Sequence, residues 1–269
     1  MRRNLKLYWC RNPIDERQNL GDELSPVLCE RLSGQRVVYS PPRRCELMAI
    51  GSVLQRAKCR WFRQGIHVWG TGLIKEKYVA RSRHCFHAVR GRLTAERIQG
   101  QSVSVYGDPA LLCGWLFSKP PTGKRYSVGL IPHYVDRQDS LVQSFVGGAR
   151  HATVIDILVR NVRQEIDDFL ERVSACEVVL SSSLHGLIIA DSLGVPNAWV
   201  SFSDQVIGNG FKFRDYYSAF GIDNPKPFTL TPSTTEDDVL VLAADYHRSG
   251  IQDLKERLLA SFPFSRSSV

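Results

Sequence analysis

The chain has 269 residues, of which 43% are hydrophobic and 23% charged, and its formal net charge is +8. These proportions are ordinary for globular proteins, and they exclude a disordered tail, a collagen-like rod and a coiled coil. At about 150 residues per domain, the length fits two small domains or one large domain.

Short apolar, β-branched runs alternate with helical periods along the chain. The predicted strands are Leu5–Cys10, Arg36–Ser40, Leu47–Ile50, His67–Gly70, Cys85–Val89, Ser102–Tyr106, Ser127–Pro132, Thr153–Ile157, Glu177–Ser181 and Ala198–Phe202. The predicted helices are Asp22–Leu32, Leu93–Ile98, Val162–Ala175, Leu187–Leu193, Asp215–Phe220, Glu236–His247 and Ile251–Phe262. Strands and helices in alternation imply parallel sheets with helical crossovers, so we expect an α/β protein.

A Pro- and Gly-containing stretch, Ser118–Arg125, divides the chain near its middle. Such stretches are typical of linkers. We therefore predict two Rossmann-like domains, residues 1–120 and 121–269, with a cleft between them where ligands bind at the carboxyl ends of strands.

Cysteine usage and hydropathy point to the cytoplasm. The seven cysteines are scattered singly, without a C-x-x-C pair or a Cys/His cluster, so we expect reduced thiols and no metal site. The apolar stretch at the N-terminus is broken by Lys6 and ends at Arg11, too short for a signal peptide. The sequence contains no apolar run of about 18 residues that would span a bilayer.

The first polar segment after a predicted strand is Asn19–Leu24. Gly21 permits a tight turn, and Asn19 with Asp22 offers an amide and a carboxylate suited to sugar hydroxyls or to general-base work. Alternatively, Asp22 is simply one of the acidic residues favoured in the first turn of a helix.

Further strands end in glycine turns, among them those at Gly70-Thr71 and at Arg90-Gly91. Backbone at such turns can approach a ligand closely. The Arg90 guanidinium can grip a phosphate or carboxylate through two parallel hydrogen bonds, or it can form a salt bridge at the surface or between domains. His133 follows a later strand, where it is either a second proton carrier or an ordinary loop residue.

The strongest signal is the segment Ser181–Gly186, where an apolar strand runs into three serines, a histidine and a glycine before a helix. The amides of a helix N-terminus together with the hydroxyls of Ser182 and Ser183 form an anion site, and His185 beside it can transfer a proton. In the alternative interpretation a serine caps the helix and His185 is a hydrogen-bonded buried residue.

A last segment, Gly208–Tyr217, interleaves Lys212 and Arg214 with aromatic residues. It fits a loop that closes on an anionic donor, an RNA-stacking patch or a solvated helix start. In an extended loop the two cations would share one face.

The order of these motifs resembles the polysaccharide pyruvyl transferase family, specifically the bacterial ketal-pyruvate transferases of exopolysaccharide synthesis, such as those of xanthan and succinoglycan. The matching segments are Asn19–Leu24, Ile50–Ser52, Trp69–Gly72, Val89–Gly91, Gly107–Pro109, Ile131–His133, Ser182–Gly186 and Phe211–Tyr217.

The resemblance implies a fold like that of two-domain (GT-B) glycosyltransferases, and transfer of pyruvate from phosphoenolpyruvate to a sugar as a cyclic ketal, with release of phosphate and without a metal or other cofactor. It implies that the histidine at position 185 is essential. Many relatives carry Arg where this chain has Ser183, so the cation for the donor phosphate is sought elsewhere. We expect the donor to contact Ser182, Ser183, Gly186, Arg90, Lys212, Arg214 and His133, the acceptor to contact Asn19, Gly21, Asp22, Gly70 and Thr71, and His185 and Asp22 to carry the proton transfers.

Two other functions are compatible with parts of the sequence. A nucleotide-sugar glycosyltransferase would share the fold, but where such enzymes often place a Glu for the ribose hydroxyls, this chain offers only Asp191. A nucleic-acid-binding protein would explain the basic charge, but no recognised motif accompanies it, so we expect no nucleic-acid partner.

The positive charge is unevenly distributed, since residues 1–125 carry 23 Lys/Arg and 9 Asp/Glu (+14) and residues 126–269 carry 12 and 18 (−6). The family resemblance implies an acceptor oligosaccharide on a polyprenyl pyrophosphate at the inner membrane face. A basic N-terminal half would hold the enzyme on anionic lipids there, at about 1 kcal/mol per nearby Lys or Arg.

Overall fold

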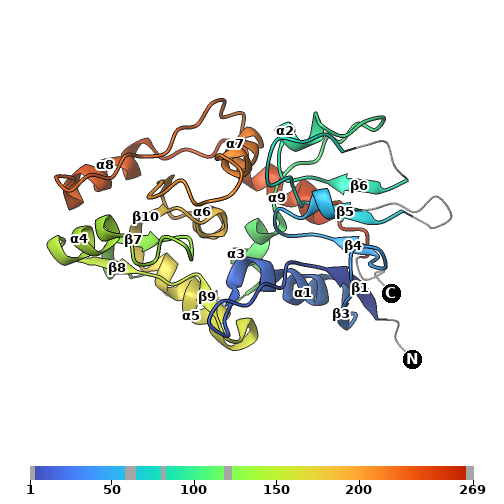
Figure 1. Cartoon of the computed structure of the whole chain (residues 1–269), viewed down its shortest axis with the longest axis horizontal. Coiled ribbons are helices and arrows are strands. Elements are labelled where there is room, and N and C mark those ends of the chain that lie inside the picture. The colour runs from blue at the N-terminus through green and yellow to red at the C-terminus, as the bar shows by residue number, and fades with distance from the viewer. Residues whose placement is uncertain (1–3, 58–64, 80–82, 118–122, 265–269) are drawn as a thin grey trace.

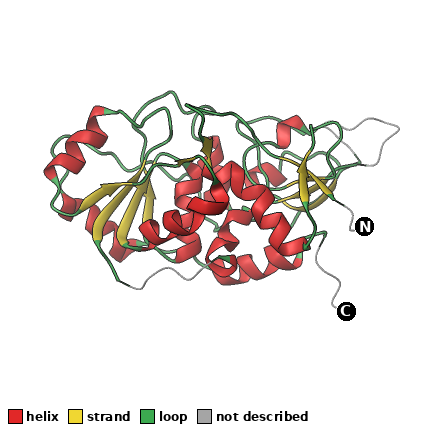
Figure 2. Ribbon diagram, turned by 90° about the horizontal axis from the view of Figure 1, so that it is seen from below, coloured by secondary structure: helices red, strands yellow, loops and turns green. Residues whose placement is uncertain are grey.

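The computed structural model describes residues 4–57, 65–79, 83–117 and 123–264. Two parallel sheets stand at opposite ends of the molecule, with helices between and around them (Figures 1 and 2). The N-terminal sheet has the order β3-β1-β4-β5-β6 and the C-terminal sheet the order β11-β10-β7-β8. An α/β protein with parallel sheets, consistent with Rossmann-like folds, is therefore confirmed.

The strands of the first sheet are β1 (Leu5–Tyr8), β3 (Val37–Tyr39), β4 (Leu47–Met48), β5 (His67–Trp69) and β6 (Cys85–Ala88), and those of the second are β7 (Tyr126–Ile131), β8 (Ala152–Val154), β10 (Cys176–Ser181) and β11 (Asn197–Trp199). The α-helices are α1 (Leu20–Ser33), α2 (Arg92–Ala95), α3 (Cys113–Leu116), α4 (Ser140–Gly148), α5 (Val162–Ser174), α6 (Leu184–Leu193), α7 (Phe211–Ser218), α8 (Glu236–Asp245) and α9 (Ile251–Ala260). Two 3-10 helices, η1 (Leu54–Arg56) and η2 (Pro109–Leu112), complete the set with a small antiparallel pair, β2 (Gln18–Asn19) and β9 (Leu158–Val159).

One predicted strand is wrong. In Ser102–Tyr106 the residues alternate as in a strand, but only Tyr106 forms a bridge, with Val89. Its backbone meets the sheet only at its end, where the Val89 N–H donates to the Val105 carbonyl at 3.1 Å and the Gly107 N–H donates to the Val89 carbonyl at 3.0 Å. Its Val103 is nevertheless buried, which explains the apolar period.

The helices α3 and α4, both 3-10 helices and the β2–β9 pair were not predicted. Two-residue strands and three- or four-residue helices are too short to show a period. The β2–β9 pair matters for the fold, because it joins residues before the first helix to residues of the C-terminal half, with Asn19 opposite Leu158.

The N-terminal and C-terminal halves share a hydrophobic core and are joined by hydrogen bonds. Buried residues of both, such as Leu24 and Val179, belong to one continuous core. The C-terminal helix α9 packs on the N-terminal half, where the Trp69 indole N–H donates to the Leu258 carbonyl at 2.9 Å. The division at residue 120 stays a prediction, and residues 118–122 of the expected linker lie outside the described residues.

No helix in the described part of the chain is long and apolar enough to cross a lipid bilayer.

Candidate active site

A cavity of about 180 Å³, which we call the cleft pocket, opens between the two halves. The starts of α1, α6 and α7 contribute to it, together with the turn after β7. Six residues predicted for the site gather there: Asn19, Asp22, His133, Ser183, His185 and Lys212. The remaining lining residues are Cys10, Ser52, Val53, Gln55, Arg56, Ile74, Tyr134 and Leu184.

The first turn of α1 meets the imidazole of His185 at Gly21. A Cβ at position 21 would lie 2.0 Å from Cγ and Nδ1 of His185, so no larger residue fits. Asn19 caps the helix, since its side chain accepts from the Gly21 N–H at 3.0 Å. Gly21 therefore serves close packing between the halves, and this packing brings Asp22 to the same pocket as His185.

His185 lies in the first turn of α6, earlier than the predicted helix start at Leu187. Its side chain is 8% exposed, and Nε2 has no hydrogen-bond partner within the described ranges. Burial lowers the pKa of His185 to about 3, and the positive charges of Lys212 and Arg90 act in the same direction. The histidine is therefore buried, neutral and unsatisfied, and an unpaired buried group of this kind calls for a functional explanation.

Ser183 is the N-cap residue of α6 but forms no side-chain capping bond. Ser183, Leu184 and His185 all line the cleft pocket. A helix N-terminus without a capping side chain favours a negatively charged ligand, because its N–H groups and the helix dipole both point toward that ligand. Ser183 and His185 of the predicted anion site line this pocket, and the binding of an anion there stays a prediction.

Asp22 and Lys212 titrate close to neutral pH. Burial raises the pKa of Asp22 to about 7, with Glu23 and Asp108 adding to the effect and Lys212 opposing it. Burial and the charge of Arg90 lower the pKa of Lys212 to about 8, against the opposite effects of Asp22 and Asp136. One pocket therefore offers a carboxyl and an amine that both exchange protons near pH 7.

His133 forms a second neutral imidazole in the pocket wall. Burial, followed by the charge of Lys212, lowers its pKa to about 3. Its ring packs against that of Tyr134 in a tilted arrangement, with centroids 4.2 Å apart and an angle of 34° between the ring planes. Its backbone N–H donates to the Ser182 hydroxyl at 2.8 Å, which fixes the turn after β7 against the start of α6.

Ser182 and Gly186 do not line the cleft pocket. The Ser182 hydroxyl donates to Asp136 at 2.7 Å and borders a second cavity. Gly186 packs against β7 and β10, and a Cβ there would lie 2.4 Å from the Ser181 hydroxyl oxygen. Both residues shape the strand-to-helix turn that carries His185.

The structure places Arg90 in a buried ion pair. Its Nη2 lies 2.9 Å from an Asp215 oxygen, and both side chains are 0% exposed. The same guanidinium donates to the Ser52 hydroxyl at 2.6 Å and to the Leu73 carbonyl at 2.5 Å. This geometry matches the salt-bridge alternative, and Arg90 acts on the pocket through its charge and through α7.

Asp215 is a positioning residue that sequence reasoning missed. Besides Arg90 it accepts from the Thr94 N–H and hydroxyl, both at 2.7 Å. Asp215 lies on α7 three residues after Lys212, so both occupy one side of that helix. The contacts to the N-terminal half therefore hold Lys212 in the cleft pocket.

The expectation that Lys212 and Arg214 share a face of an extended loop is wrong. Helix α7 begins at Phe211, four residues earlier than predicted, after Gly210 with φ 73°. Residues two apart on a helix do not face each other. Lys212 lines the pocket, whereas Arg214 turns back to donate to the Asn209 carbonyl at 2.8 Å.

Gly70 and Thr71 lie outside the cleft pocket as well. Gly70 has φ 83° and packs on Pro109, and the Thr71 hydroxyl donates to the Gly51 carbonyl at 2.7 Å. These contacts stabilise the turn that carries Ser52. Two residues that line the cleft pocket, Gln55 and Arg56, were not predicted. They belong to η1, a helix of three residues that is too short to show a sequence pattern.

Among the described residues, no three His, Cys, Asp or Glu side chains are grouped in a way that could hold a metal ion.

Fold and site together define a parallel α/β protein whose halves enclose a pocket of buried titratable groups at a helix N-terminus without a side-chain cap. A family model described as polysaccharide pyruvyl transferase matches residues 19–204. The chain belongs to this family, which implies a transferase. The matched range contains every lining residue of the cleft pocket except Cys10 and Lys212.

Two relatives extend the comparison. The chain is 29% identical over 223 residues to uncharacterized protein L143 of Acanthamoeba polyphaga mimivirus, covering 76% of this chain and 72% of that protein. It is 27% identical over 222 residues to the succinoglycan biosynthesis protein ExoV of Rhizobium meliloti (strain 1021), covering 80% of this chain and 64% of that protein.

Proposed function

We propose that this protein transfers pyruvate from phosphoenolpyruvate to a sugar of an exopolysaccharide repeat unit, forming a cyclic ketal and releasing phosphate. The observation that carries the proposal is the unpartnered, neutral His185 at the open N-terminus of α6, in a pocket shared with Lys212 and Asp22. Membership of the pyruvyl transferase family and the likeness to a succinoglycan biosynthesis protein support it.

The anionic donor is assigned to the side of the cleft pocket formed by α6 and α7. Lys212 supplies positive charge there, and the Ser183 hydroxyl and the backbone of the first turn of α6 supply donors, while Arg56 on η1 adds a second positive charge from the N-terminal half. Arg56 joins Lys212 as a candidate for the phosphate or the carboxylate, because the guanidinium of Arg90 is already occupied by Asp215 and Ser52.

His185 delivers a proton to the methylene carbon of phosphoenolpyruvate. Burial keeps the imidazole neutral in the free protein. The negative charge of the bound donor raises the pKa of the imidazole, which takes up a proton from water before it acts as the acid. One sugar hydroxyl then bonds to the adjacent carbon and passes its proton to the Asp22 carboxylate. The second hydroxyl closes the ketal as the carbon–oxygen bond to phosphate breaks, and its proton leaves with the phosphate. Asp22 then releases its proton to water, which balances the proton that His185 took up when the donor bound, and both groups return to their starting states.

The finer features follow from the same assignment. We infer a GT-B-like pair of domains with the cleft pocket between them, a cytoplasmic enzyme without metal or other cofactor, and an acceptor carried on a polyprenyl pyrophosphate. The basic N-terminal half, at +14 over residues 1–125, would rest on anionic lipid of the inner membrane face. Sedimentation with anionic vesicles at low salt tests the membrane contact, and a protein that stays in the supernatant contradicts it.

The decisive experiment supplies phosphoenolpyruvate with a lipid-linked oligosaccharide fraction and measures released phosphate and acid-labile ketal. We expect one phosphate per ketal formed. Lys212→Met should abolish stabilisation by phosphoenolpyruvate in a thermal shift, whereas Lys226→Met, which removes an exposed lysine, should leave it unchanged. Sugar transfer from a nucleotide sugar, without phosphate release from phosphoenolpyruvate, would overturn the proposal in favour of a glycosyltransferase.

A further inference from the structure

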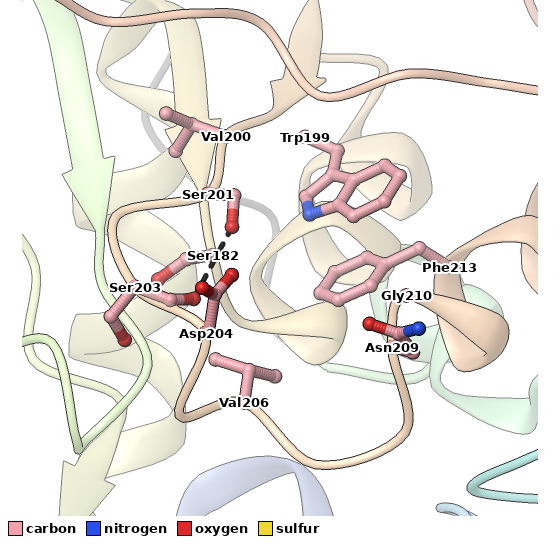
Figure 3. Close-up of a pocket in the computed structure, with 10 residues that line it drawn as sticks. All are labelled: Ser182, Trp199, Val200, Ser201, Ser203, Asp204, Val206, Asn209, Gly210 and Phe213. Carbon is pink, nitrogen blue, oxygen red and sulfur yellow. Dashed lines mark hydrogen bonds between the residues drawn. The ribbon is translucent and has the colours of Figure 1, made fainter.

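A second cavity, of about 190 Å³, lies on the other side of the turn that carries Ser182 and Ser183. We call it the Trp199 pocket (Figure 3). It is lined by Ser182, Trp199, Val200, Ser201, Ser203, Asp204, Val206, Asn209, Gly210 and Phe213. None of these residues lines the cleft pocket, so the Trp199 pocket is a separate cavity in the C-terminal half.

One wall of the Trp199 pocket is a rigid aromatic pair. The rings of Trp199 and Phe213 stack with centroids 4.5 Å apart and an angle of 8° between their planes. Phe213 is buried, and Gly210 packs so closely on the pair that a Cβ there would lie 2.8 Å from the indole. In the described part of the chain the Trp199 indole N–H has no hydrogen-bond acceptor, and Figure 3 shows it on the side that faces Ser201.

The opposite wall is polar and is held in place by one buried carboxylate. Asp136, only 2% exposed, accepts from the Ser182 hydroxyl at 2.7 Å and from the Ser203 hydroxyl at 2.5 Å. These two bonds anchor the loop that follows β11 to the start of α6. Asp204 and Asn209, on the same loop, bring a carboxylate and an amide to the rim of the pocket.

The chemistry of these walls selects a neutral ligand rich in hydroxyl groups. Asp204 carries the only charge among the lining residues, and a negative charge disfavours a phosphate or carboxylate group. Carboxylate, amide and hydroxyl oxygens accept hydrogen bonds from sugar hydroxyls, and the indole N–H can donate one back. A flat apolar wall opposite such groups is suited to the C–H face of a sugar ring.

The position of the pocket connects it with the reaction. Ser182 lines the Trp199 pocket and Ser183 the cleft pocket, and the same alternation occurs at Phe213 and Lys212. The backbone at Ser182-Ser183 and at Lys212-Phe213 therefore forms a wall shared by the two pockets. We propose that the Trp199 pocket binds a sugar ring of the acceptor glycan while phosphoenolpyruvate occupies the cleft pocket, an inference that rests on the proposed function.

Saturation-transfer NMR of the full chain with methyl glucoside, methyl galactoside, methyl mannoside, cellobiose and lactose tests this directly. We expect at least one of these sugars to bind, and Trp199→Ala to weaken its affinity about tenfold. Trp115→Ala, which removes a tryptophan that is 43% exposed and lies outside both pockets, is the matched control and should bind the sugar as before. Asp204→Ala and Asn209→Gly change exposed loop residues without disturbing the core, since glycine tolerates the φ of 52° at position 209, and both should also weaken sugar binding.

Phosphoenolpyruvate serves as the second probe, through its effect on the melting temperature. The three substitutions in the Trp199 pocket should leave this stabilisation unchanged, and Lys212→Met should remove it without affecting sugar binding. Stabilisation by phosphoenolpyruvate with no sugar bound overturns the sugar pocket and leaves the proposed function intact. Binding of a uridine nucleotide that is lost in Trp199→Ala also overturns it, by assigning the pocket to a nucleobase. Sugar binding without any response to phosphoenolpyruvate would instead overturn the proposed donor.

Discussion

The molecule contains two clusters of buried polar groups. One surrounds Asp191 in the C-terminal half, and the other lines the cleft pocket between the two halves. Asp191 is 1% exposed and accepts four hydrogen bonds. One oxygen takes those of Asn197 and Tyr246, both at 2.6 Å, and the other takes those of Tyr216 at 2.5 Å and Arg248 at 3.2 Å. The cleft pocket, in contrast, leaves Nε2 of His185 without a partner in the described structure.

The contrast between the two clusters distinguishes charged groups that stabilise the fold from groups that are free to react. A buried carboxylate whose oxygens are all paired contributes to a unique fold, and its loss leaves several donors unsatisfied. Groups held in a pocket with shifted pKa values and without partners are kept at a cost in folding free energy. Substitution should therefore act in opposite ways: in the Asp191 cluster it should lower stability, and in the cleft pocket it should mainly lower activity.

The largest expected effect belongs to His185→Ala. Loss of the proton-transfer group should lower the rate of phosphate release from phosphoenolpyruvate by about 10² to 10⁴. Because Nε2 has no partner to lose, the melting temperature should stay close to that of the unchanged protein. His151→Ala, at an exposed position, is the control and should retain the full rate. A His185→Ala protein that is folded and fully active would remove the histidine from the reaction.

Asp191→Ala should have the largest effect on stability, about 3–5 kcal/mol in urea unfolding, because Arg248 and the two tyrosine hydroxyls would lose their acceptor. Asp253→Ala offers a matched control, since that carboxylate pairs with Arg257 at 3.6 Å and is 70% exposed. We expect the control to change stability by less than about 1 kcal/mol. Equal effects of the two substitutions would contradict a structural role for the Asp191 cluster.

Gly21→Ala tests the contact between the halves. The added methyl group would overlap the His185 ring at 2.0 Å, and overpacking of this kind costs about 1–3 kcal/mol. Activity should fall as well, because the imidazole must move. Gly147→Ala, in helix α4 with nothing within 4 Å of the added Cβ, should instead be neutral or slightly stabilising. Unfolding curves and phosphate release measured on both variants decide the matter.

Asp22→Asn should give the smallest effect and the most specific pH dependence. Burial raises the pKa of Asp22 from 3.8 to about 7, so the folded protein favours the protonated carboxyl, and the stability cost of ionising it builds up between about pH 4 and pH 7. The amide variant should therefore be more stable than the unchanged protein at pH 8, by about 1 kcal/mol in a pocket that admits water. The difference should shrink as pH falls through 7 and vanish below about 4.

Asp167→Asn, at an exposed position of α5, controls for the loss of one negative charge. Thermal unfolding at a series of pH values provides the measurement. A stability difference for Asp22→Asn that does not vary between pH 4 and 8 would show that the Asp22 carboxyl has an ordinary pKa.

Most of the fold was predictable because parallel α/β proteins carry strong local signals. The apolar runs at β7 and β10 and the amphipathic α5 are long enough to show their periods, and the structure places them within a few residues of expectation. The strand expected at Ser102–Tyr106 is wrong because an apolar period records burial, whereas a strand also needs a ladder of hydrogen bonds, and here these bonds occur only around Tyr106.

The residues of the site could be predicted where they follow a strand or begin a helix. Asn19, Asp22, His133 and His185 were found because parallel strands bring their carboxyl ends to one edge, and the structure brings these residues into one pocket. Arg56 was missed because nothing local distinguishes it from the other arginines of a basic half. Asp215 was missed because its partner Arg90 lies 125 residues away in sequence.

The sequence by itself determined the alternation of strands and helices, the family, and several residues that line the cleft pocket, since each of these depends on short segments with their own pattern. Only the tertiary structure decided which charges are paired and which are left open. Arg90 is neutralised by Asp215, Asp191 by its four donors, and His185 by none of the described residues. Pairing and burial depend on what the rest of the chain places nearby, and these two quantities set the pKa values on which the proposed chemistry rests.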